Sequence, residues 1–433
     1  MRVPTLISSV FLAVTLVGAL PATPTPTPAP AQVEARDLCT LLNSLLGLCT
    51  LLGITSSSST HTSTTHTSTS TSTPPPTTTS TSTATPTPST CTQPAQRAEW
   101  RTFTATQKAT FLTAVKCLAS KPHWSQLQQN NTGPDIPPMD TSGSLYDDFV
   151  WIHIDFNHHI HSTAWFFPWH RWYLNLYVRA LNTQCGYSGN LPYWDWTQDA
   201  ADFEHATIWD GDSSSGVGTW GDPNQDYQIV DGAWGLNQAQ PFYINYPIHH
   251  AIRRQFTLQP YENFHYGYLI SDPTLNANET FTQARVDEAV TSHDGDFQGF
   301  QTDFQNYQGP HAGVHLITGG DLTGLCPTAA QNCVPGETWS PNDPMFFMHH
   351  AMVDRIWWQW QSRANNKLLF GGGSDQVLDS LSDYEEYPLG NGTPLNFSSI
   401  IPTDGLNYLD TKTNVAIGDV MDIQGGYLCY EYV

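Results

Sequence analysis

Apolar residues recur at helical spacing in the first half of the chain. Phe111, Val115 and Leu118 fall on one face of a segment that begins after Thr104, a residue type that favours a helix start. Further along, positions 170, 174, 177 and 181 share one side of a second predicted helix. Pro168 suits the first turn of that helix, because the backbone donor that proline lacks would have no helical partner there.

Two more helices are predicted in the second half. Pro310 favours the start of a third helix, and Gly319 with Gly320 favours its end. Residues 345–361 form a fourth helical segment. The stretches 197–247 and 371–433 are rich in Gly, Pro, Asp and aromatic residues, which is typical of loops with short strands. We therefore predict a mainly α fold, a four-helix bundle with long loops and a few short strands.

The first ninety residues lack the pattern of a folded domain. Residues 1–20 begin with a positive charge and continue as an apolar run, which is typical of a secretory signal peptide. Residues 55–90 contain only Ser, Thr, Pro, Ala and His and predict an extended, O-glycosylated linker. Residues 21–54 carry leucines on one helical face and are expected to be a propeptide or an accessory hydrophobic segment for adhesion or dimerisation. The catalytic domain is thus predicted to span residues 91–433.

Charge and hydropathy exclude several kinds of partner. The chain has 16 Lys and Arg against 39 Asp and Glu, a formal net charge of −23. Nucleic-acid binding needs clustered basic residues, and an anionic membrane surface repels this excess of acid. No segment after the signal is long and apolar enough to span a bilayer. We expect a secreted, extracellular protein that binds neither nucleic acid nor membrane.

Secretion places the cysteines in an oxidising compartment, where an even number favours disulfides. The chain has eight cysteines, and the sequence does not determine their pairing. The disulfide candidates in the predicted domain are Cys91, Cys117, Cys185, Cys326, Cys333 and Cys429. The candidates for N-glycosylation, each the first residue of an Asn-x-Ser/Thr motif, are Asn130, Asn278, Asn391 and Asn396.

Six histidines in the helical segments form two groups. The first group is His153, His161 and His170, and the second is His311, His315 and one of the tandem pair His349 and His350. Two histidines four apart on a helix direct both rings to one point. Burying six imidazoles without partners would be costly, and a shared metal centre removes that cost. Three imidazoles hold one ion and leave open positions, so we expect two copper ions that bind dioxygen.

Zinc hydrolysis is the competing interpretation, because imidazole binds zinc as well as copper. A zinc hydrolase of the His-Glu-x-x-His type has a catalytic carboxylate beside its ligands. Between His311 and His315 this chain has Ala312, Gly313 and Val314. In addition, no cysteine of the two groups lies at the spacing of a structural zinc or blue-copper site. The pattern therefore favours copper.

The surroundings of these histidines resemble the type-3 copper proteins, which are the tyrosinases, catechol oxidases and haemocyanins, and especially the short secreted fungal polyphenol oxidases. The resemblance runs in order through residues 91–433, and the combination of motifs is highly specific. Its motifs are DFVWIH at 148–153, FPWHRW at 167–172, PYWDW at 192–196, PHAGVH at 310–315, and the segment from NDP at 342–344 to HHAMVDRIW at 349–357.

The resemblance implies a ligand set. Copper A would be held by His153, His161 and His170, and copper B by His311, His315 and His350. Helical periodicity does not distinguish His349 from His350. The family uses the second residue of this pair, which makes His349 a buried neighbour of the ligands. Asp354 is expected to accept a hydrogen bond that orients a ligand, and Phe346 corresponds to the residue that covers copper A at the substrate entrance.

Two positions linked to monophenol hydroxylation depart from the pattern of hydroxylating family members. Those members often have Asn after the first copper B ligand and an upstream Glu that holds a water, whereas this chain has Ala312 and Gln305. An amide cannot take up the proton that a monophenol must lose, and a missing base typically costs ~10²–10⁴-fold in rate. We therefore expect a catechol oxidase that converts o-diphenols to o-quinones and reduces dioxygen to water, with weak or absent monophenol hydroxylation.

Two other functions are compatible with the resemblance. A tyrosinase or o-aminophenol oxidase would also hydroxylate monophenols, so a comparison of phenolic substrates distinguishes it. A non-catalytic, haemocyanin-like protein would bind dioxygen without turnover, and any oxidation of catechol excludes it.

Overall fold

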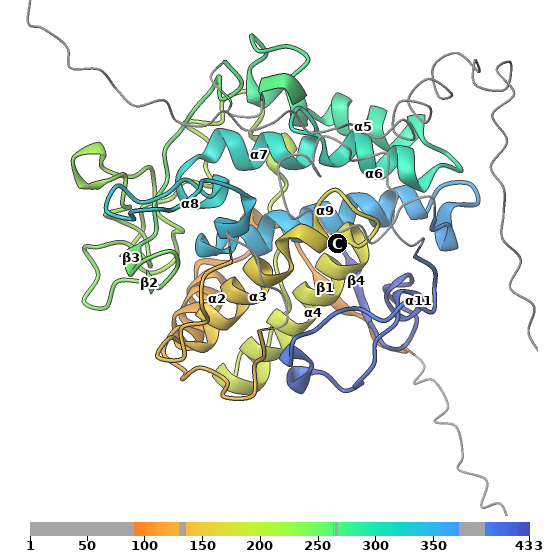
Figure 1. Cartoon of the computed structure of the whole chain (residues 1–433), viewed down its shortest axis with the longest axis horizontal. Coiled ribbons are helices and arrows are strands. Elements are labelled where there is room, and N and C mark those ends of the chain that lie inside the picture. Colours follow the sequence, from red (N-terminus) through yellow and green to blue (C-terminus); the bar gives the residue numbers. More distant parts are fainter. Residues whose placement is uncertain (1–90, 130–135, 263, 265–266, 372–394) are drawn as a thin grey trace, which may run out of the picture. The chain divides into compact units, whose positions relative to one another are not determined.

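The computed structural model describes residues 91–129, 136–262, 264, 267–371 and 395–433, and these are mainly helical (Figure 1). The α-helices are α2 (Ala105–Leu118), α3 (Leu145–Ile160), α4 (Phe166–Cys185), α5 (Gln283–Ser292), α6 (Phe297–Gln305), α7 (Pro310–Thr318), α8 (Gly320–Thr323), α9 (Met345–Gln361) and α11 (Ile417–Val420). The strands are β1 (Ala95–Arg97), β2 (Tyr243–Ile244), β3 (His250–Ala251) and β4 (Tyr430–Tyr432). The predicted mainly α class is confirmed.

Several expectations fall on residues that the structure does not describe. They are the signal peptide at 1–20, the segment 21–54, the linker 55–90, and the glycosylation candidates Asn130 and Asn391. Of the other two candidates, Asn396 is exposed, whereas the side-chain nitrogen of Asn278 donates to the Ala200 carbonyl at 2.8 Å. No helix of the described residues combines the length and apolar character needed to cross a membrane.

The four helices predicted from spacing and terminal residues are present. Thr104 caps α2 through a reciprocal pair of contacts with Gln107, which satisfies backbone donors at the helix start. Pro168 lies in the first turn of α4, and Pro310 is the first residue of α7. Gly319, with a φ of +64°, follows the last residue of α7. Its left-handed conformation suits glycine, and a Cβ there would lie 1.9 Å from the Gln255 carbonyl oxygen.

Three of these helices carry the core of the domain. α3 begins with a capping box between Ser144 and Asp147, and all but one of its residues are buried. Most of α4 and α9 is buried too, and the two helices pack against each other. Figure 1 shows α9 between α7 on one side and α3 with α4 on the other. Three helices of this core and α7 therefore bring distant parts of the sequence to the middle of the domain.

The first and last described segments of the domain are joined. β1 pairs in parallel with β4, with Ala95 opposite Tyr430, and Cys91 is bonded to Cys429. The remaining disulfides of the described residues are Cys117–Cys185, between α2 and α4, and Cys326–Cys333, between α8 and the following 3₁₀ helix. All six cysteine candidates of the domain are thus paired.

A buried charge cluster lies beneath the paired strands. The Asp354 carboxylate, on α9, receives hydrogen bonds from Arg97 at 3.1 Å, from Tyr430 at 2.6 Å, and from Arg171 and Tyr432. All five side chains are buried. Burial alone would raise the pKa of Asp354, but the two guanidinium groups and the two hydroxyls outweigh it, so that this pKa lies below its usual value. The cluster connects β1, α4, α9 and β4.

The disulfides should differ in their contribution to stability. Replacing Cys91 and Cys429 together with serine is expected to lower the free energy of unfolding by about 2–5 kcal/mol, because the bond closes a loop with a sequence separation of 338 residues. The Cys326 and Cys333 pair closes a separation of only 7 residues, and its removal should cost ~2 kcal/mol. Urea unfolding of both double variants measures the difference. An equal or larger loss for the short loop would contradict the loop-entropy argument.

Candidate metal centre

The first histidine group is assembled from α3, the residue after it, and α4. His153 lies on α3, His161 ends this helix, and His170 lies in the second turn of α4. The ring centroids of His153 and His161 are 4.9 Å apart, and those of His161 and His170 are 5.3 Å apart. All three side chains are buried, and their ligand atoms lie within 4.8 Å of one another. The predicted group is therefore brought together.

The second group combines α7 with α9. His311 and His315 lie one turn apart on α7, and their Nε2 atoms are 3.2 Å apart. The Nε2 atom of His350, on α9, lies 3.4 Å from that of His311. His349 also belongs to this cluster, with its ring 4.5 Å from that of His315. The structure thus keeps both members of the tandem pair near α7, while the printed nitrogen contact favours His350.

Backbone carbonyls fix the orientation of four of these rings. The Nδ1 atoms of His153, His161, His170 and His315 face the carbonyl oxygens of Thr338, Asn157, Phe166 and Leu322 at 3.2, 3.2, 2.7 and 2.6 Å. A proton on Nδ1 satisfies this contact and leaves Nε2 with a free lone pair. The buried Nε2 atoms of His153 and His170 have no hydrogen-bond partner. This arrangement is typical of metal ligands, whose second nitrogen is held by a carbonyl.

The imidazoles are held in the neutral form that binds metals. Burial lowers the pKa of every histidine in both groups, and it brings that of His315 to about 4. Repulsion between neighbouring imidazoles lowers the pKa further, as His161 and His170 do for His153. Neutral rings whose Nε2 lone pairs face one another repel unless a cation lies between them. The donor set therefore fits a metal ion in each group.

The two groups are adjacent. The rings of His170 and His350 are stacked with centroids 4.4 Å apart and planes 10° apart, although the two residues belong to different groups. Phe166, one turn before His170, lies 4.8 Å from the ring of His311. Two ions bound here would therefore be neighbours, which is what a dinuclear centre needs.

A cavity of about 440 Å³ opens onto the histidines. His161, His311 and His315 contribute to its wall, together with Ala312 and Gln305. The Gln305 side-chain oxygen accepts a hydrogen bond from the Ser162 backbone at 2.9 Å, while its buried amide nitrogen has no partner. Its size is that of a small-molecule pocket and suffices for a single aromatic ring.

Two predicted site residues are placed differently from expectation. Phe346 was predicted at the substrate entrance, but it is fully buried and is not part of the cavity wall. It lies in the first turn of α9, where its ring packs 5.0 Å from that of His153 and 4.1 Å from that of His350. Asp354 was predicted to orient a ligand, but its carboxylate is held by the arginines and tyrosines of the charge cluster. Backbone carbonyls supply the contacts expected of it.

The segment before α9 carries site residues that the sequence interpretation missed. The 3₁₀ helix η7 (Glu337–Asn342) supplies the Thr338 carbonyl that faces His153, and its first residue, Glu337, lines the cavity. Glu337 is the one charged residue between positions 321 and 343. A lone charge in such a stretch was a signal that could have identified it.

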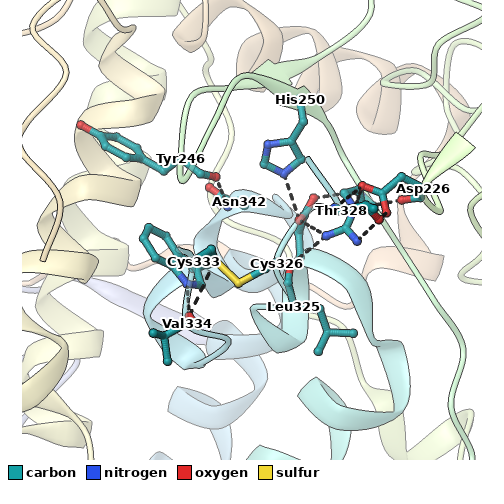
Figure 2. Close-up of a disulfide and its surroundings, with 12 residues drawn as sticks. Asp226, Tyr246, His250, Leu325, Cys326, Thr328, Cys333, Val334 and Asn342 are labelled. Atoms are coloured by element: carbon teal, nitrogen blue, oxygen red, sulfur yellow. Dashed lines mark hydrogen bonds and ion pairs between the residues drawn. A yellow bond between two sulfur atoms is a disulfide. The ribbon is translucent and has the colours of Figure 1, made fainter. Parts of the chain in front are cut away.

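Interactions on both sides of η7 hold this segment in place. Figure 2 shows the Cys326–Cys333 disulfide with Val334 and Asn342 nearby. The Trp339 indole donates to the Val334 carbonyl at 2.9 Å, and the Asn342 side chain donates to the Tyr246 carbonyl at 2.6 Å. The Gly336 backbone donates to the Gly324 carbonyl at 3.1 Å. Since both ends are tied, the backbone at Glu337 has a defined position.

Comparisons with known proteins agree with this geometry. The family model of the common central domain of tyrosinase matches residues 143–363. The tyrosinase-like protein phomQ1 of Diaporthe leptostromiformis is 31% identical over 361 residues, which cover 79% of this chain and 78% of that protein. Tyrosinase ustQ of Aspergillus flavus is 29% identical over 353 residues, covering 79% and 80%. The N-acetyl-6-hydroxytryptophan oxidase ivoB of Emericella nidulans is 27% identical over 378 residues, covering 78% and 91%.

A solved structure supports the same fold. A polyphenol oxidase variant from Thermothelomyces thermophila aligns with a TM-score of 0.56 and 22% identity, over 80% of this chain and 90% of that one. The chain thus belongs to the tyrosinase family of type-3 copper proteins. Membership implies an oxidoreductase with a dinuclear copper site, a phenolic substrate and dioxygen, and the two histidine clusters fit such a site.

Proposed function

We propose that this protein is a catechol oxidase. The observation that carries the proposal is the pair of adjacent, buried clusters of neutral imidazoles, which open onto one cavity. His153, His161 and His170 would hold copper A, and His311, His315 and His350 would hold copper B. When bound, the two copper ions supply the electron transfer between the phenol and dioxygen.

The reaction balances without a further reductant. Two o-diphenols lose two electrons and two protons each and become two o-quinones. One dioxygen takes up the four electrons and four protons and becomes two waters. The protein contributes by holding the rings, by keeping them neutral, and by admitting a flat aromatic ring through the cavity. A cavity of this size also supports turnover rather than dioxygen carriage, because a carrier needs no room for a phenol.

The choice of diphenols over monophenols is supported by the wall next to His311. Ala312 offers no hydrogen bond to a substrate, and the Gln305 amide cannot accept a proton from one. We expect the copper-loaded domain to oxidise 4-methylcatechol with a kcat/KM at least ~10²-fold above that for hydroxylation of 4-methylphenol. Oxygen uptake measured with both substrates tests this expectation. Lag-free hydroxylation at a comparable rate would contradict it.

A second candidate activity is monophenol hydroxylation, as in a tyrosinase or an o-aminophenol oxidase. One observation favours it, since the Glu337 carboxylate does line the cavity. A carboxylate can accept the proton that a monophenol loses, as an amide cannot. If 4-methylphenol is hydroxylated efficiently and Glu337→Gln abolishes this reaction while Gln305→Ala does not, the second candidate replaces the first.

We also propose that the domain spans residues 91–433 and is secreted after removal of residues 1–20. Three disulfides in the described residues support an oxidising compartment. Mass spectrometry of the protein recovered from culture medium, with and without enzymatic deglycosylation, tests the cleavage site and the glycosylation of Asn396 and of the linker.

A further inference from the structure

The charge of the cavity wall is uneven. Among the described residues that line it, Glu337 is the one acidic side chain, and none is Lys or Arg. Much of the remaining wall is apolar, with Pro260, Phe264, Leu269 and Leu316 among its members. A single negative charge in a largely apolar wall is screened less than one on an open surface. A bound molecule therefore meets a defined negative charge.

This charge lies close to the proposed reaction site. Glu337 is half-buried, and the adjacent Thr338 faces His153 through its carbonyl oxygen. Burial is the main effect on the pKa of His161 and lowers it, whereas the Glu337 charge acts on this ring in the opposite direction, and also on His315. A ligand that reaches the exposed edges of these rings is therefore within the field of the carboxylate.

The position of the carboxylate is restrained by its backbone. The Gly336–Gly324 hydrogen bond, the Trp339–Val334 hydrogen bond and the Cys326–Cys333 disulfide surround η7 (Figure 2). A restrained charge discriminates between ligands better than a mobile one, because it needs little reorganisation on binding.

We propose that Glu337 makes the cavity selective for phenols that carry a cationic side chain, such as an ammonium group, against phenols that carry a carboxylate. This proposal rests on the proposed oxidase function and specifies its substrate class. The ring enters toward the histidines, and the substituent of the ring lies within reach of the Glu337 carboxylate. An ammonium group gains an attraction there, and a carboxylate meets repulsion.

A competing explanation is the charge of the whole chain. A net charge of −23 attracts cations to any part of the surface and would favour cationic substrates without a specific residue. The two explanations differ in what one substitution does. Loss of one acid among 39 barely changes the overall field, whereas loss of Glu337 removes the only acidic charge that the described residues place in the wall.

The experiment uses three catechols that differ in the charge of one substituent. They are dopamine, 4-ethylcatechol and 3-(3,4-dihydroxyphenyl)propionate. We expect the copper-loaded protein to prefer dopamine to the propionate in kcat/KM, each divided by the value for 4-ethylcatechol. Glu337→Gln should reduce this preference about three- to tenfold, mainly through KM. Glu337→Asp should retain most of it, and higher ionic strength should weaken it in the wild type.

Glu204→Gln is the matched control, because it removes one exposed acid that does not line the cavity. A readout independent of turnover is the binding of phenethylamine and 3-phenylpropionate to copper-free protein by calorimetry, where Glu337→Gln should reduce the same preference. An unchanged preference in Glu337→Gln, or equal losses in Glu337→Gln and Glu204→Gln, overturns the proposal. Absence of oxidation of 4-ethylcatechol by the copper-loaded wild type instead overturns the proposed oxidase function.

Discussion

Replacing His350 with alanine is expected to abolish catechol oxidation, with a loss of at least ~10³-fold in kcat. The copper content should fall from two ions to about one per chain, because a site with three ligands loses one of them. His350 contacts His311 through Nε2 at 3.4 Å and stacks on His170 of the other group. Oxygen uptake and elemental analysis of the purified variant measure both effects.

His349→Ala is the informative comparison, because both members of the tandem pair lie near α7. If His349 only supports the ligands, its loss should reduce copper affinity by about 10–100-fold and leave two ions bound at saturating copper. His205→Ala serves as a control, since His205 is exposed and distant in role. Retention of two ions and activity in His350→Ala, with their loss in His349→Ala, would reverse the assignment of the third copper B ligand.

Removing the charge of Asp354 should cause the largest loss of stability. Asp354→Asn leaves the buried guanidinium groups of Arg97 and Arg171 without their shared counter-charge. Breaking a buried ion pair from one side typically costs about 3–5 kcal/mol. Chemical unfolding followed by tryptophan fluorescence measures this loss, and the exposed Asp202→Asn should leave the midpoint unchanged. A loss for Asp354→Asn as small as that of the control would contradict this account of the cluster.

The pH dependence of the same variant follows from the direction of the pKa shift. Because the pKa of Asp354 is lowered in the folded state, ionisation of this group favours folding. Its contribution is complete above the ordinary carboxyl pKa of about 4, and it is lost as the pH falls through the lowered value. The stability difference between wild type and Asp354→Asn should therefore be constant near neutrality and shrink in strong acid.

The sequence predicted what depends on local spacing. The helix after Thr104, the helix start at Pro310 and the pairing of His311 with His315 each follow from residues within a few turns of one another. The joint occurrence of two histidine groups in buried, aromatic segments sufficed to predict that each group converges. The approach of one group to the other, seen in the His170–His350 stack, came only from the family resemblance.

Contacts between distant segments were not predictable in the same way. Asp354 and Phe346 were assigned from their place in a motif on one helix, but the partners of Asp354 come from residues 97, 171, 430 and 432. Glu337 reaches the cavity because η7 is tied to the Gly324 and Tyr246 carbonyls, which no periodicity reveals. Such long-range contacts decide where a side chain points, and single-sequence patterns carry no information on them.

The Asp354 cluster also bears on how the chain folds during synthesis. Arg97 and Tyr432 both bind this carboxylate, although 335 positions separate them. A ribosome-bound chain that still lacks its last residues has the acid and both arginines, but neither tyrosine nor the closing strand. The helix of His350 can therefore reach its final packing only after translation has ended. Metal loading is accordingly a post-translational event that follows release of the complete polypeptide.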